Sequence, residues 1–273
     1  MKKKLVNYIL IALGSIMLSN CNKQTENQDV PLSFDSSKKL VSDQIISVFE
    51  NSTPIIQYNY IENLKDGRGF TAGRAGFTTA TCDLLEVVNR YTQKVPNNVL
   101  ASFIPKLKPL CNNNDSSTSG ISNLPQAWIT AAKDPIFKQM QDSVSDEFYF
   151  KPVLAYTQKL SLKYPLSILN LYDACIQHGD GTDLDGLAAM IKRTNQALGG
   201  SPTEGVDEKK WLGKFMTIRK NTLQNPANTS TKEVWRESVY RVDALRKIFD
   251  EQNFNLKTPL KLVVWGTSFI LPQ

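Results

Sequence analysis

Histidine and cysteine are scarce in this chain, with one His and four Cys among 273 residues. No Cys-x-x-Cys pair occurs and His178 is the single histidine, so a zinc site of the His and Cys type is not expected. Lys and Arg form no cluster interleaved with aromatic residues, so nucleic acid is not an expected partner. Fixed-period repeats and low-complexity tracts are also missing. We therefore expect a globular protein that uses no metal and no other cofactor.

Long apolar runs are scarce as well, and the one at the N-terminus has a recognisable form. The basic "MKKK" precedes the apolar "LVNYILIALGSIML", which is short for a transmembrane helix. The run ends in "LSNC", residues 18–21, a pattern typical of a bacterial lipoprotein signal. It predicts cleavage before Cys21 and a lipid on the Cys21 thiol, the alternative being an ordinary signal peptide with an incidental Cys. We expect an exported protein, lipid-anchored at the cell envelope or outer surface, or extracellular.

The positive charge of the chain depends partly on this signal. The formal net charge is +6, but residues 1–20 hold three Lys and no acid, which leaves 29 basic and 26 acidic residues, or +3. Residues 21–36 are polar and turn-rich and predict a flexible tether. Residues 37–273 are long enough for one large core or two lobes. We expect a single domain of two lobes over this span.

Most of the chain after residue 40 shows helical patterns. In "VSDQIISVFENS" the apolar positions 45, 46, 48 and 49 share one side, and Ser42 is a plausible N-cap. In "TTATCDLLEVVNRYTQKV" the apolar side is formed by Leu84, Leu85, Val87 and Val88. Further helical patterns cover 126–144, 150–162, 164–177, 184–198, 208–223 and 232–252.

The helical period is interrupted between residues 55 and 78. "IIQYNYIENL" alternates at Ile56, Tyr58 and Tyr60, "KDGRG" has turn chemistry, and "FTAGRAGFT" follows. We expect a small antiparallel hairpin or three-stranded sheet here. Residues 111–123 predict a loop, and the tail from residue 256 is punctuated by Pro. The predicted fold class is α+β, mainly α, with one small antiparallel sheet near the N-terminal side.

Two carboxylates flank this predicted sheet, Glu50 where the first helical pattern ends and Asp66 in the glycine-rich turn. Taken alone, the first is most often a solvated residue and the second a turn former. A pair on separate elements can instead protonate a glycosidic oxygen and activate a water. Gly67 and Gly69 leave room for a sugar near Asp66, and the Thr71 hydroxyl can orient the water. This is the layout of lysozyme-like hydrolases, an analogy of fold only.

Longer stretches carry a specific resemblance. "ENS", then "QYNYIENLKDGRGFTAGRAGF", then "TCDLLEVV" strongly resembles the chitosanases of glycoside hydrolase family 46. Further stretches agree in order: "AWITAAKDPIFKQMQ", "LYDACIQHG", "RVDALRKIF" and "LKTPLKL". The resemblance implies a lysozyme-like catalytic domain of two lobes with its sheet beside an active-site cleft. It also implies a monomer that cleaves chitosan, or partly deacetylated chitin, internally and with inversion at the anomeric carbon.

The resemblance assigns roles to single residues as well. It implies Glu50 as the general acid, Asp66 as the base that activates water, and Thr71 as a residue that helps to hold that water. Tyr60 and Arg68 match residues that line the cleft, and Asp83 matches a carboxylate that recognises a substrate amine. The residues that match an ion network behind the acid are Asp173, Arg219 and Arg241.

For several residues, a structural explanation stays open beside a functional role. Asp173, inside an apolar helical pattern, needs a partner if it is buried, and a structural ion pair is as reasonable there as a functional one. Asp83 can merely complement a helix dipole, with Thr81 as a possible cap. His178 before "GDG" fits a helix C-terminus favoured by the dipole, and we leave it out of the catalytic set. Cys175 predicts a buried thiol, and the sequence leaves open whether any of the cysteines pair.

Two other functions compete with an endo-acting chitosanase. A lysozyme-like muramidase would act on peptidoglycan, whose N-acetylated sugars offer no free amine to a carboxylate. A non-catalytic surface glycan-binding lipoprotein would tolerate the loss of one carboxylate, yet Glu50 and Asp66 both stand in intact motifs. The sequence therefore favours the hydrolase.

Overall fold

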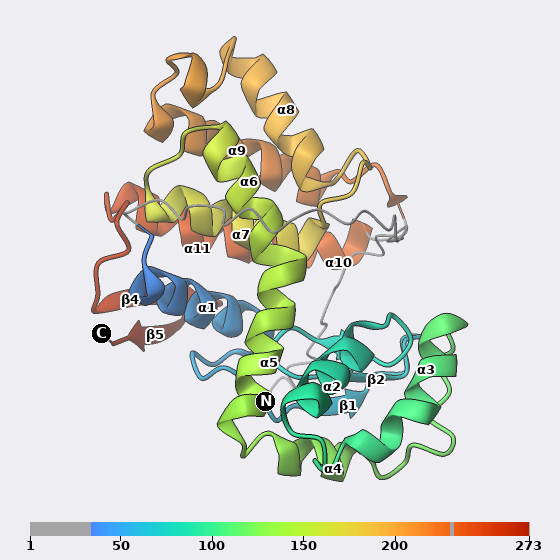
Figure 1. Ribbon diagram of the computed structural model, residues 1–273. Helices are drawn as coiled ribbons and strands as arrows, with labels where there is room; N and C mark the ends of the chain where they lie inside the picture. Colours follow the sequence, from blue (N-terminus) through green and yellow to red (C-terminus); the bar gives the residue numbers. More distant parts are fainter. Residues whose placement is uncertain (1–33, 230–231, 273) are drawn as a thin grey trace. The chain divides into compact units, whose positions relative to one another are not determined.

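The computed structural model describes residues 34–229 and 232–272, which divide into two compact units (Figure 1). One unit runs to Ile55 and resumes at Tyr149, and the other is formed by Ile56–Phe148. Each unit has a hydrophobic core of its own. The predicted signal peptide and nearly all of the predicted tether lie outside the described residues. Within the described residues, no helix combines the length and apolar character needed to span a membrane.

The discontinuous unit is almost entirely helical. The chain leaves it after α1 (Ser36–Asn51) and returns through the π-helix Asp146–Phe150. Its further elements are α6 (Lys151–Lys159), α7 (Pro165–His178), α8 (Leu187–Leu198), the 3-10 helix Pro202–Glu204, α9 (Glu208–Gln224), α10 (Lys232–Glu237), α11 (Val239–Asp250), β4 (Leu260–Val264) and β5 (Thr267–Leu271). Helix α7 lies at the centre, because α1, α6, α8, α9 and α11 all pack against it and every one of its residues is buried.

Helix α1 begins earlier than the sequence pattern predicts. The Asp35 carboxylate caps it by accepting a hydrogen bond from the Lys38 amide at 2.9 Å. The predicted N-cap, Ser42, is wrong: this residue is buried inside the helix and donates its hydroxyl to the Lys38 carbonyl at 2.8 Å. A Ser that bonds a backbone carbonyl four residues back is compatible with a helix interior. The predicted apolar side at positions 45, 46, 48 and 49 is confirmed as buried.

The C-terminal tail contains a second sheet, so the prediction of a single sheet is wrong. Strands β4 and β5 pair antiparallel from Leu260 with Leu271 to Val264 with Thr267. Leu260, Leu262 and Val264 are buried and alternate with more exposed residues, the period expected of a strand with one covered face. The hairpin packs beside α1, and β4 also packs beside α11 (Figure 1).

The continuous unit holds the predicted three-stranded sheet, which is confirmed. Its elements are β1 (Ile61–Asn63), β2 (Phe70–Ala72), β3 (Phe77–Thr78), α2 (Asp83–Lys94), the 3-10 helix Ala101–Phe103, α3 (Ile104–Asn112), α4 (Leu124–Ala131) and α5 (Pro135–Ser145). The strands pair antiparallel in the order β1-β2-β3. Helix α2 buries Leu84, Leu85, Val87 and Val88, as its pattern predicts. The predicted fold class, mainly helical with a small antiparallel sheet, is confirmed.

Residues 56–60 are not a strand, although their alternation predicts one. The carbonyl of Tyr58 accepts hydrogen bonds from the Trp128 indole at 3.0 Å and from the Gln141 amide group at 2.9 Å. Both donors are fully buried side chains, from α4 and α5. Side chains from distant helices thus satisfy a backbone group that a strand would pair in a ladder.

Two glycines of the sheet region sit where no other residue fits well. Gly69 has φ +77, and a Cβ there would lie 2.1 Å from the Thr79 hydroxyl. Gly73 has φ +70, and a Cβ there would lie 2.3 Å from the Gln141 side-chain oxygen. Both positions combine a left-handed backbone with close packing, so the local structure requires glycine at 69 and at 73.

The continuous unit also contains a disulfide between Cys82 and Cys111, and Cys175 is free and buried in the other unit. The pairing, which the sequence leaves open, joins the start of α2 to α3 across 29 residues. In the chain-entropy account, a crosslink of this loop length stabilises a fold by about 3–4 kcal/mol.

We expect the double variant Cys82→Ser/Cys111→Ser to lose about 3–4 kcal/mol of unfolding free energy relative to the oxidised protein. Denaturant melts with and without a reducing agent would measure the difference. The double variant with and without the reducing agent is the control, since it lacks the Cys82–Cys111 crosslink and its midpoint should not change. Equal midpoints for the oxidised protein and the double variant would show that the crosslink does not stabilise this unit.

Candidate active site

Glu50 lies in the last turn of α1, a position at which the helix dipole disfavours a negative charge. The Arg241 guanidinium compensates: its Nη1 donates to Glu50 Oε1 at 2.6 Å. The Glu50 side chain is 12% exposed, and its second oxygen, Oε2, has no hydrogen bond to any described residue. One oxygen is therefore fixed, and the other remains open to a ligand.

Behind Arg241 lies a buried ion network. Arg241 donates through Nε and Nη2 to Asp173 Oδ1, and Arg219 Nη2 lies 2.6 Å from Asp173 Oδ2. Asp173 and Arg219 are completely buried, and Gln177 accepts a further bond from Arg219 Nη2 at 2.6 Å. The network thus connects α11, α7 and α9 to the Glu50 carboxylate. This is the arrangement in which the sequence resemblance places Asp173, Arg219 and Arg241, and their supporting role stays a prediction.

The charges of the network fix its protonation. Burial alone would raise the pKa of Asp173, but the Arg219 and Arg241 guanidiniums outweigh it and hold that pKa below its usual value. Burial would lower the pKa of Arg241, and the negative charges of Asp173 and Glu50 raise it instead. Asp173 is therefore an anion shared by two cations, and it competes with Glu50 for the positive charge of Arg241.

Tyr240 is a member of this site that sequence reasoning missed. Its hydroxyl donates to the carbonyl of Phe49 at 2.7 Å, one residue before Glu50. Burial raises the pKa of Tyr240 to about 12, so the phenol stays neutral and remains a donor. Tyr240 and Arg241 are adjacent on α11 and hold the end of α1 by its backbone and its side chain. A Tyr next to an Arg in a helical pattern gives no signal of this.

His178 ends α7, as predicted, but the charge assumed for it is wrong. Its ring is buried and packs edge-on against Trp235, with ring centroids 4.7 Å apart. Burial and the nearby Arg219 charge lower the pKa of His178 well below its usual value. A neutral imidazole gains nothing from a helix dipole, so packing explains the residue better.

Asp66 lies in the loop between β1 and β2 of the other unit. Its Oδ1 accepts from the Arg68 amide at 3.1 Å, and its Oδ2 accepts from the Arg68 side chain at 3.1 and 2.5 Å. The Asp66 side chain is 31% exposed. Arg68, a predicted cleft residue, therefore contacts the predicted base directly and fixes its orientation.

Thr71 and Tyr60 lie in the same unit. Thr71 is the central residue of β2 and is fully buried, yet its hydroxyl oxygen has no hydrogen-bond partner among the described residues. An unpaired buried hydroxyl is uncommon and indicates a functional site or a bound water. Tyr60 precedes β1 and donates to Glu62 at 3.2 Å, and burial together with the Glu62 charge raises its pKa to about 12.

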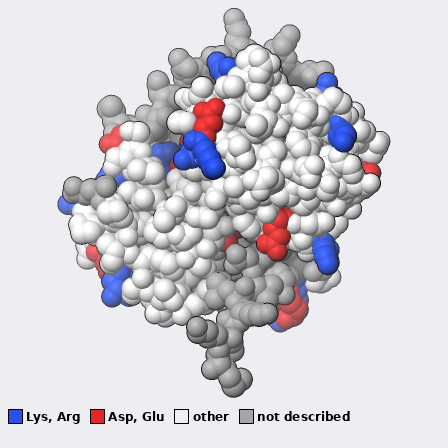
Figure 2. All heavy atoms as spheres, turned by 90° about the horizontal axis from the view of Figure 1, so that it is seen from below, with Lys and Arg blue, Asp and Glu red and all other residues white. Residues whose placement is uncertain are grey.

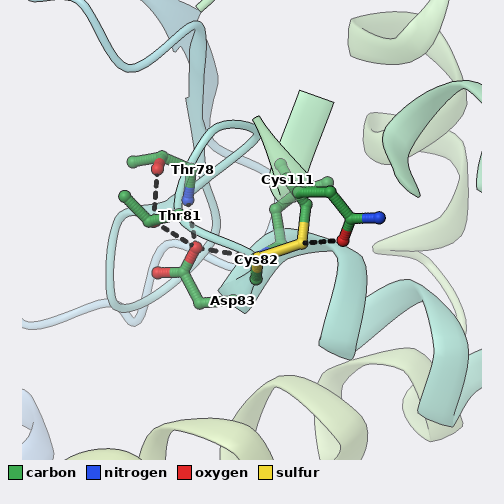
Figure 3. Close-up of a disulfide and its surroundings, with 7 residues drawn as sticks. Thr78, Thr81, Cys82, Asp83 and Cys111 are labelled. Atoms are coloured by element: carbon green, nitrogen blue, oxygen red, sulfur yellow. Dashed lines mark hydrogen bonds between the residues drawn. A yellow bond between two sulfur atoms is a disulfide. The ribbon is translucent and has the colours of Figure 1, made fainter. Parts of the chain in front are cut away.

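Asp83 begins α2 and organises the turn before it (Figure 3). Its Oδ1 accepts from the Thr78 amide at 2.8 Å, the Thr81 hydroxyl at 2.8 Å and the Leu84 amide at 2.9 Å. Thr81 is not the N-cap that the sequence predicts, because Cys82 takes that position without a side-chain bond. Burial raises the pKa of Asp83, against the effect of these hydrogen bonds. Its Oδ2 has no hydrogen bond to the described residues.

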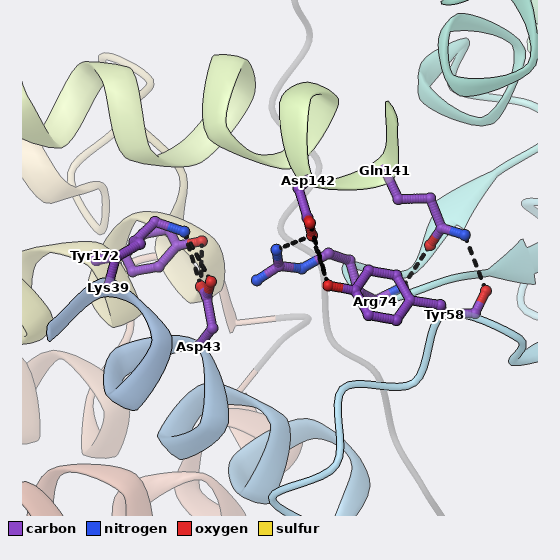
Figure 4. A network of polar contacts seen from close by, with 7 residues as sticks. All are labelled: Lys39, Asp43, Tyr58, Arg74, Gln141, Asp142 and Tyr172. Atoms are coloured by element: carbon purple, nitrogen blue, oxygen red, sulfur yellow. Dashed lines mark hydrogen bonds and ion pairs between the residues drawn. The ribbon is translucent and has the colours of Figure 1, made fainter. Parts of the chain in front are cut away.

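Two further polar networks, one in each unit, support these positions (Figure 4). In the continuous unit, Asp142 on α5 accepts from the Tyr58 hydroxyl at 2.9 Å and forms an ion pair with Arg74. In the discontinuous unit, Asp43 accepts from Lys39 at 2.9 Å and from the Tyr172 hydroxyl at 3.2 Å, which ties α1 to α7. The Lys39–Asp43 pair has helical i,i+4 spacing, whereas the sequence gives no sign of the long-range bonds to Asp142 and from Tyr172.

Charge on the surface is mixed. On the face in Figure 2, Lys and Arg are interspersed with Asp and Glu, and the described residues drawn there form no large area of one sign. Cys21, the predicted lipidation site, lies outside the described residues.

Comparisons with known proteins identify the family of the chain. The family model for glycosyl hydrolase family 46 matches residues 44–260. A chitosanase from Bacillus subtilis (strain 168) is 49% identical over 226 residues, which cover 83% of this chain and 82% of that protein. A chitosanase from Streptomyces sp. (strain N174) is 34% identical over 241 residues, which cover 87% of this chain and 83% of that protein.

A solved structure of a chitosanase from Gynuella sunshinyii in complex with chitotetraose is similar, with a TM-score of 0.78 and 49% identity over 88% of this chain and 99% of that chain. A mutant chitosanase from Bacillus subtilis MY002, complexed with 6 GlcN, also has a TM-score of 0.78, with 46% identity over 86% of this chain and 98% of that chain. Matches of this extent define a glycoside hydrolase. The chain belongs to glycosyl hydrolase family 46.

Proposed function

We propose that the protein is an endo-acting chitosanase that hydrolyses β-1,4 bonds between glucosamine units of chitosan by a single displacement with inversion. The observation that carries this proposal is the Glu50 carboxyl, fixed through Oε1 by Arg241 and open at Oε2. Its support is membership of the family and the similarity to chitosanases. The acid and the base, Glu50 and Asp66, come from different units of the chain.

The acid step takes place at the open oxygen of Glu50. Oε1 accepts from Arg241, so the proton to be delivered resides on Oε2 and passes to the glycosidic oxygen as the bond to the anomeric carbon breaks. The leaving unit departs as an alcohol, and Glu50 is left as a carboxylate. Arg241 then stabilises the new negative charge through the bond that it already makes.

The base step uses Asp66 on a water molecule. A carboxylate has about four lone-pair positions, and the three bonds from Arg68 leave one of them, on Oδ1, to accept a proton from water. The unpaired Thr71 hydroxyl supplies a further partner for that water. The water oxygen bonds to the anomeric carbon on the face opposite the leaving oxygen, and a β-linkage therefore yields an α product.

The decisive experiment incubates the protein separately with chitosan, chitin and peptidoglycan and identifies the products by mass spectrometry. We expect glucosamine oligomers from chitosan, with the α anomer dominant in NMR spectra of fresh digests. Products from peptidoglycan alone would favour the muramidase, and binding to chitosan without cleavage would favour a glycan-binding protein. A fresh digest rich in the β anomer would contradict the single displacement.

Asp83 gives a test of amine recognition. Asp83→Asn retains an oxygen for the bonds from Thr78 and Leu84 but removes the charge that would attract a glucosamine ammonium. We expect it to weaken binding of fully deacetylated chitosan by about 2–5 kcal/mol, with less effect on partly acetylated chitosan and little change in Tm. Asp83→Ala should in addition lower Tm, because it leaves the Thr78 and Leu84 amides and the Thr81 hydroxyl without their acceptor. Equal losses of kcat/KM on both polymers would remove Asp83 from recognition.

We also propose that the protein is exported and anchored by a lipid on Cys21. The support is the basic and apolar segment that ends in "LSNC", and the polar residues 22–36 that would separate the anchor from the catalytic units. Labelling of expressing bacteria with an alkyne fatty acid should tag the protein and not the Cys21→Ala variant. Equal labelling of both would contradict the anchor.

A further inference from the structure

The turn of the C-terminal hairpin places a tryptophan where the backbone does not favour one. Strands β4 and β5 are joined by only Trp265 and Gly266, whose φ angles are +49 and +79. A two-residue hairpin loop with both φ angles positive is the turn for which Asn-Gly is the preferred sequence. A large aromatic residue in the first position breaks this preference, and such local exceptions point to function.

The Trp265 side chain is exposed on one side and supported on the other. It is 60% exposed, while Trp128, Trp211 and Trp235 are buried. Its ring centroid lies 4.1 Å from that of Tyr240, at an interplanar angle of 48°. One face of the indole is therefore held by a phenol and the rest is open to solvent.

Tyr240 connects this exposed ring to the acid. Its hydroxyl is fixed to the Phe49 carbonyl at 2.7 Å, and its neighbour Arg241 bonds the Glu50 carboxylate at 2.6 Å. The hairpin itself packs beside α1, which carries Glu50 (Figure 1). All these residues belong to one unit, and the Tyr240 ring is the link between the exposed indole and the end of α1 that carries Glu50.

We propose that Trp265 is a stacking platform for a glucosamine unit of chitosan bound beside Glu50. This inference rests on the proposed chitosanase function and adds a binding residue to it. The indole offers a broad apolar face to the C–H groups of a sugar ring, and an aromatic face also attracts a nearby ammonium. A polymer whose units carry an amine matches both properties. The alternative is that Trp265 only shields Tyr240.

The first test uses the fluorescence of the protein in the Glu50→Gln background, which prevents turnover. Because the other three tryptophans are buried, quenching by acrylamide reports mainly on Trp265. We expect a saturating glucosamine hexamer to reduce this quenching, and free glucosamine to reduce it less. Quenching that is unchanged by the bound hexamer would overturn the platform, whatever the variants do.

The second test compares substitutions at the turn. Trp265→Asn places the residue that this turn prefers, so the hairpin should keep its Tm while the platform is lost. We expect a rise of about three- to tenfold in hexamer Kd, and in KM on chitosan, and Trp265→Phe should restore part of the loss. Ile270→Thr is the control, since Ile270 is an exposed apolar residue of the same hairpin and should leave both constants unchanged.

The outcomes separate the two proposals. If the wild-type protein does not cleave chitosan, the proposed function fails, and the platform fails with it. If the wild type cleaves chitosan and Trp265→Asn binds the hexamer with unchanged Kd, only the platform fails. If Trp265→Asn lowers Tm, Trp265→Phe binds the hexamer with normal Kd, and the hexamer leaves the quenching of Trp265 in the Glu50→Gln protein unchanged, Trp265 acts only as a cover for Tyr240.

Discussion

Glu50→Gln should reduce chitosan cleavage by about 10²–10⁴-fold or more, while the fold and substrate binding remain nearly intact. The amide keeps the shape of the side chain, and its oxygen can still accept the bond that Arg241 donates to Oε1. It cannot release a proton from the position of Oε2, so the leaving oxygen would depart without protonation. Measurement of kcat and of hexamer Kd separates the loss of chemistry from a loss of binding.

Glu251→Gln is the matched control for this variant. Glu251 also stands at the C-terminal end of a helix, α11, but it is exposed. Its substitution removes the same charge from the same kind of position in the same unit, and kcat should not change. Near-normal turnover by Glu50→Gln would show that another group supplies the proton. A Tm lowered to near the assay temperature would show that activity is lost because the variant unfolds.

The sheet region shows how far local sequence chemistry predicts structure. Glycines at 67 and 69 gave the turn between β1 and β2, and all three strands lie within the predicted span. The strand expected at residues 56–60 failed because the Tyr58 carbonyl is satisfied by Trp128 and Gln141, which come from helices α4 and α5. The Trp128 bond spans 70 positions of sequence and the Gln141 bond spans 83, and no local pattern encodes such bonds.

The helix breaks and the second hairpin have similar explanations. The pattern at 126–144 is two helices, because Asp134 caps α5 and Pro135 starts it. The pattern at 232–252 is also two helices, with Ser238 between α10 and α11. The β4–β5 hairpin was missed because its turn is Trp-Gly and lacks the usual Asn-Gly signal.

The candidate site likewise contains residues to which the sequence points and residues that only the structure reveals. Motifs in the sequence make Glu50, Asp66 and the ionic residues candidates, and the structure brings Glu50 together with Arg241, Asp173 and Arg219. They cannot give Tyr240, whose part depends on a bond to a backbone carbonyl 191 positions away. The same limit applies to the disulfide, since three cysteines of equal standing in the sequence allow more than one pairing.

Arg219→Ala should lower the unfolding free energy by about 3–5 kcal/mol, and Tm by on the order of 10 °C. Arg219 is completely buried, and its loss leaves Arg241 as the only ionic partner of Asp173 among the described residues. Arg241 would then be drawn more strongly to Asp173 and less to Glu50. We therefore expect kcat to fall more than KM changes, even when activity is measured well below the Tm of the variant.

Lys220→Ala is the control that shows whether the losses of Tm and kcat in Arg219→Ala come from the burial of its ion pair. Lys220 is the next residue on α9, and its ion pair with Asp243 links α9 to α11 at 2.6 Å, but the two side chains are 40% and 52% exposed. An exposed pair contributes about 0–1 kcal/mol, so this variant should have nearly wild-type Tm and kcat. Arg219→Lys keeps the charge and should recover part of the stability and of kcat.

The dependence on pH gives an independent check of the Arg219 network. The pKa of Asp173 is held below its usual value in the folded protein, so its ion pairs contribute stability above the unfolded pKa of about 4. That contribution is lost as pH falls through the lower, folded value. The Tm difference between wild type and Arg219→Ala should therefore be largest near neutral pH and should narrow in acid. A difference that stays constant from neutral to strongly acidic pH would assign the loss to a packing cavity rather than to the charge of Asp173.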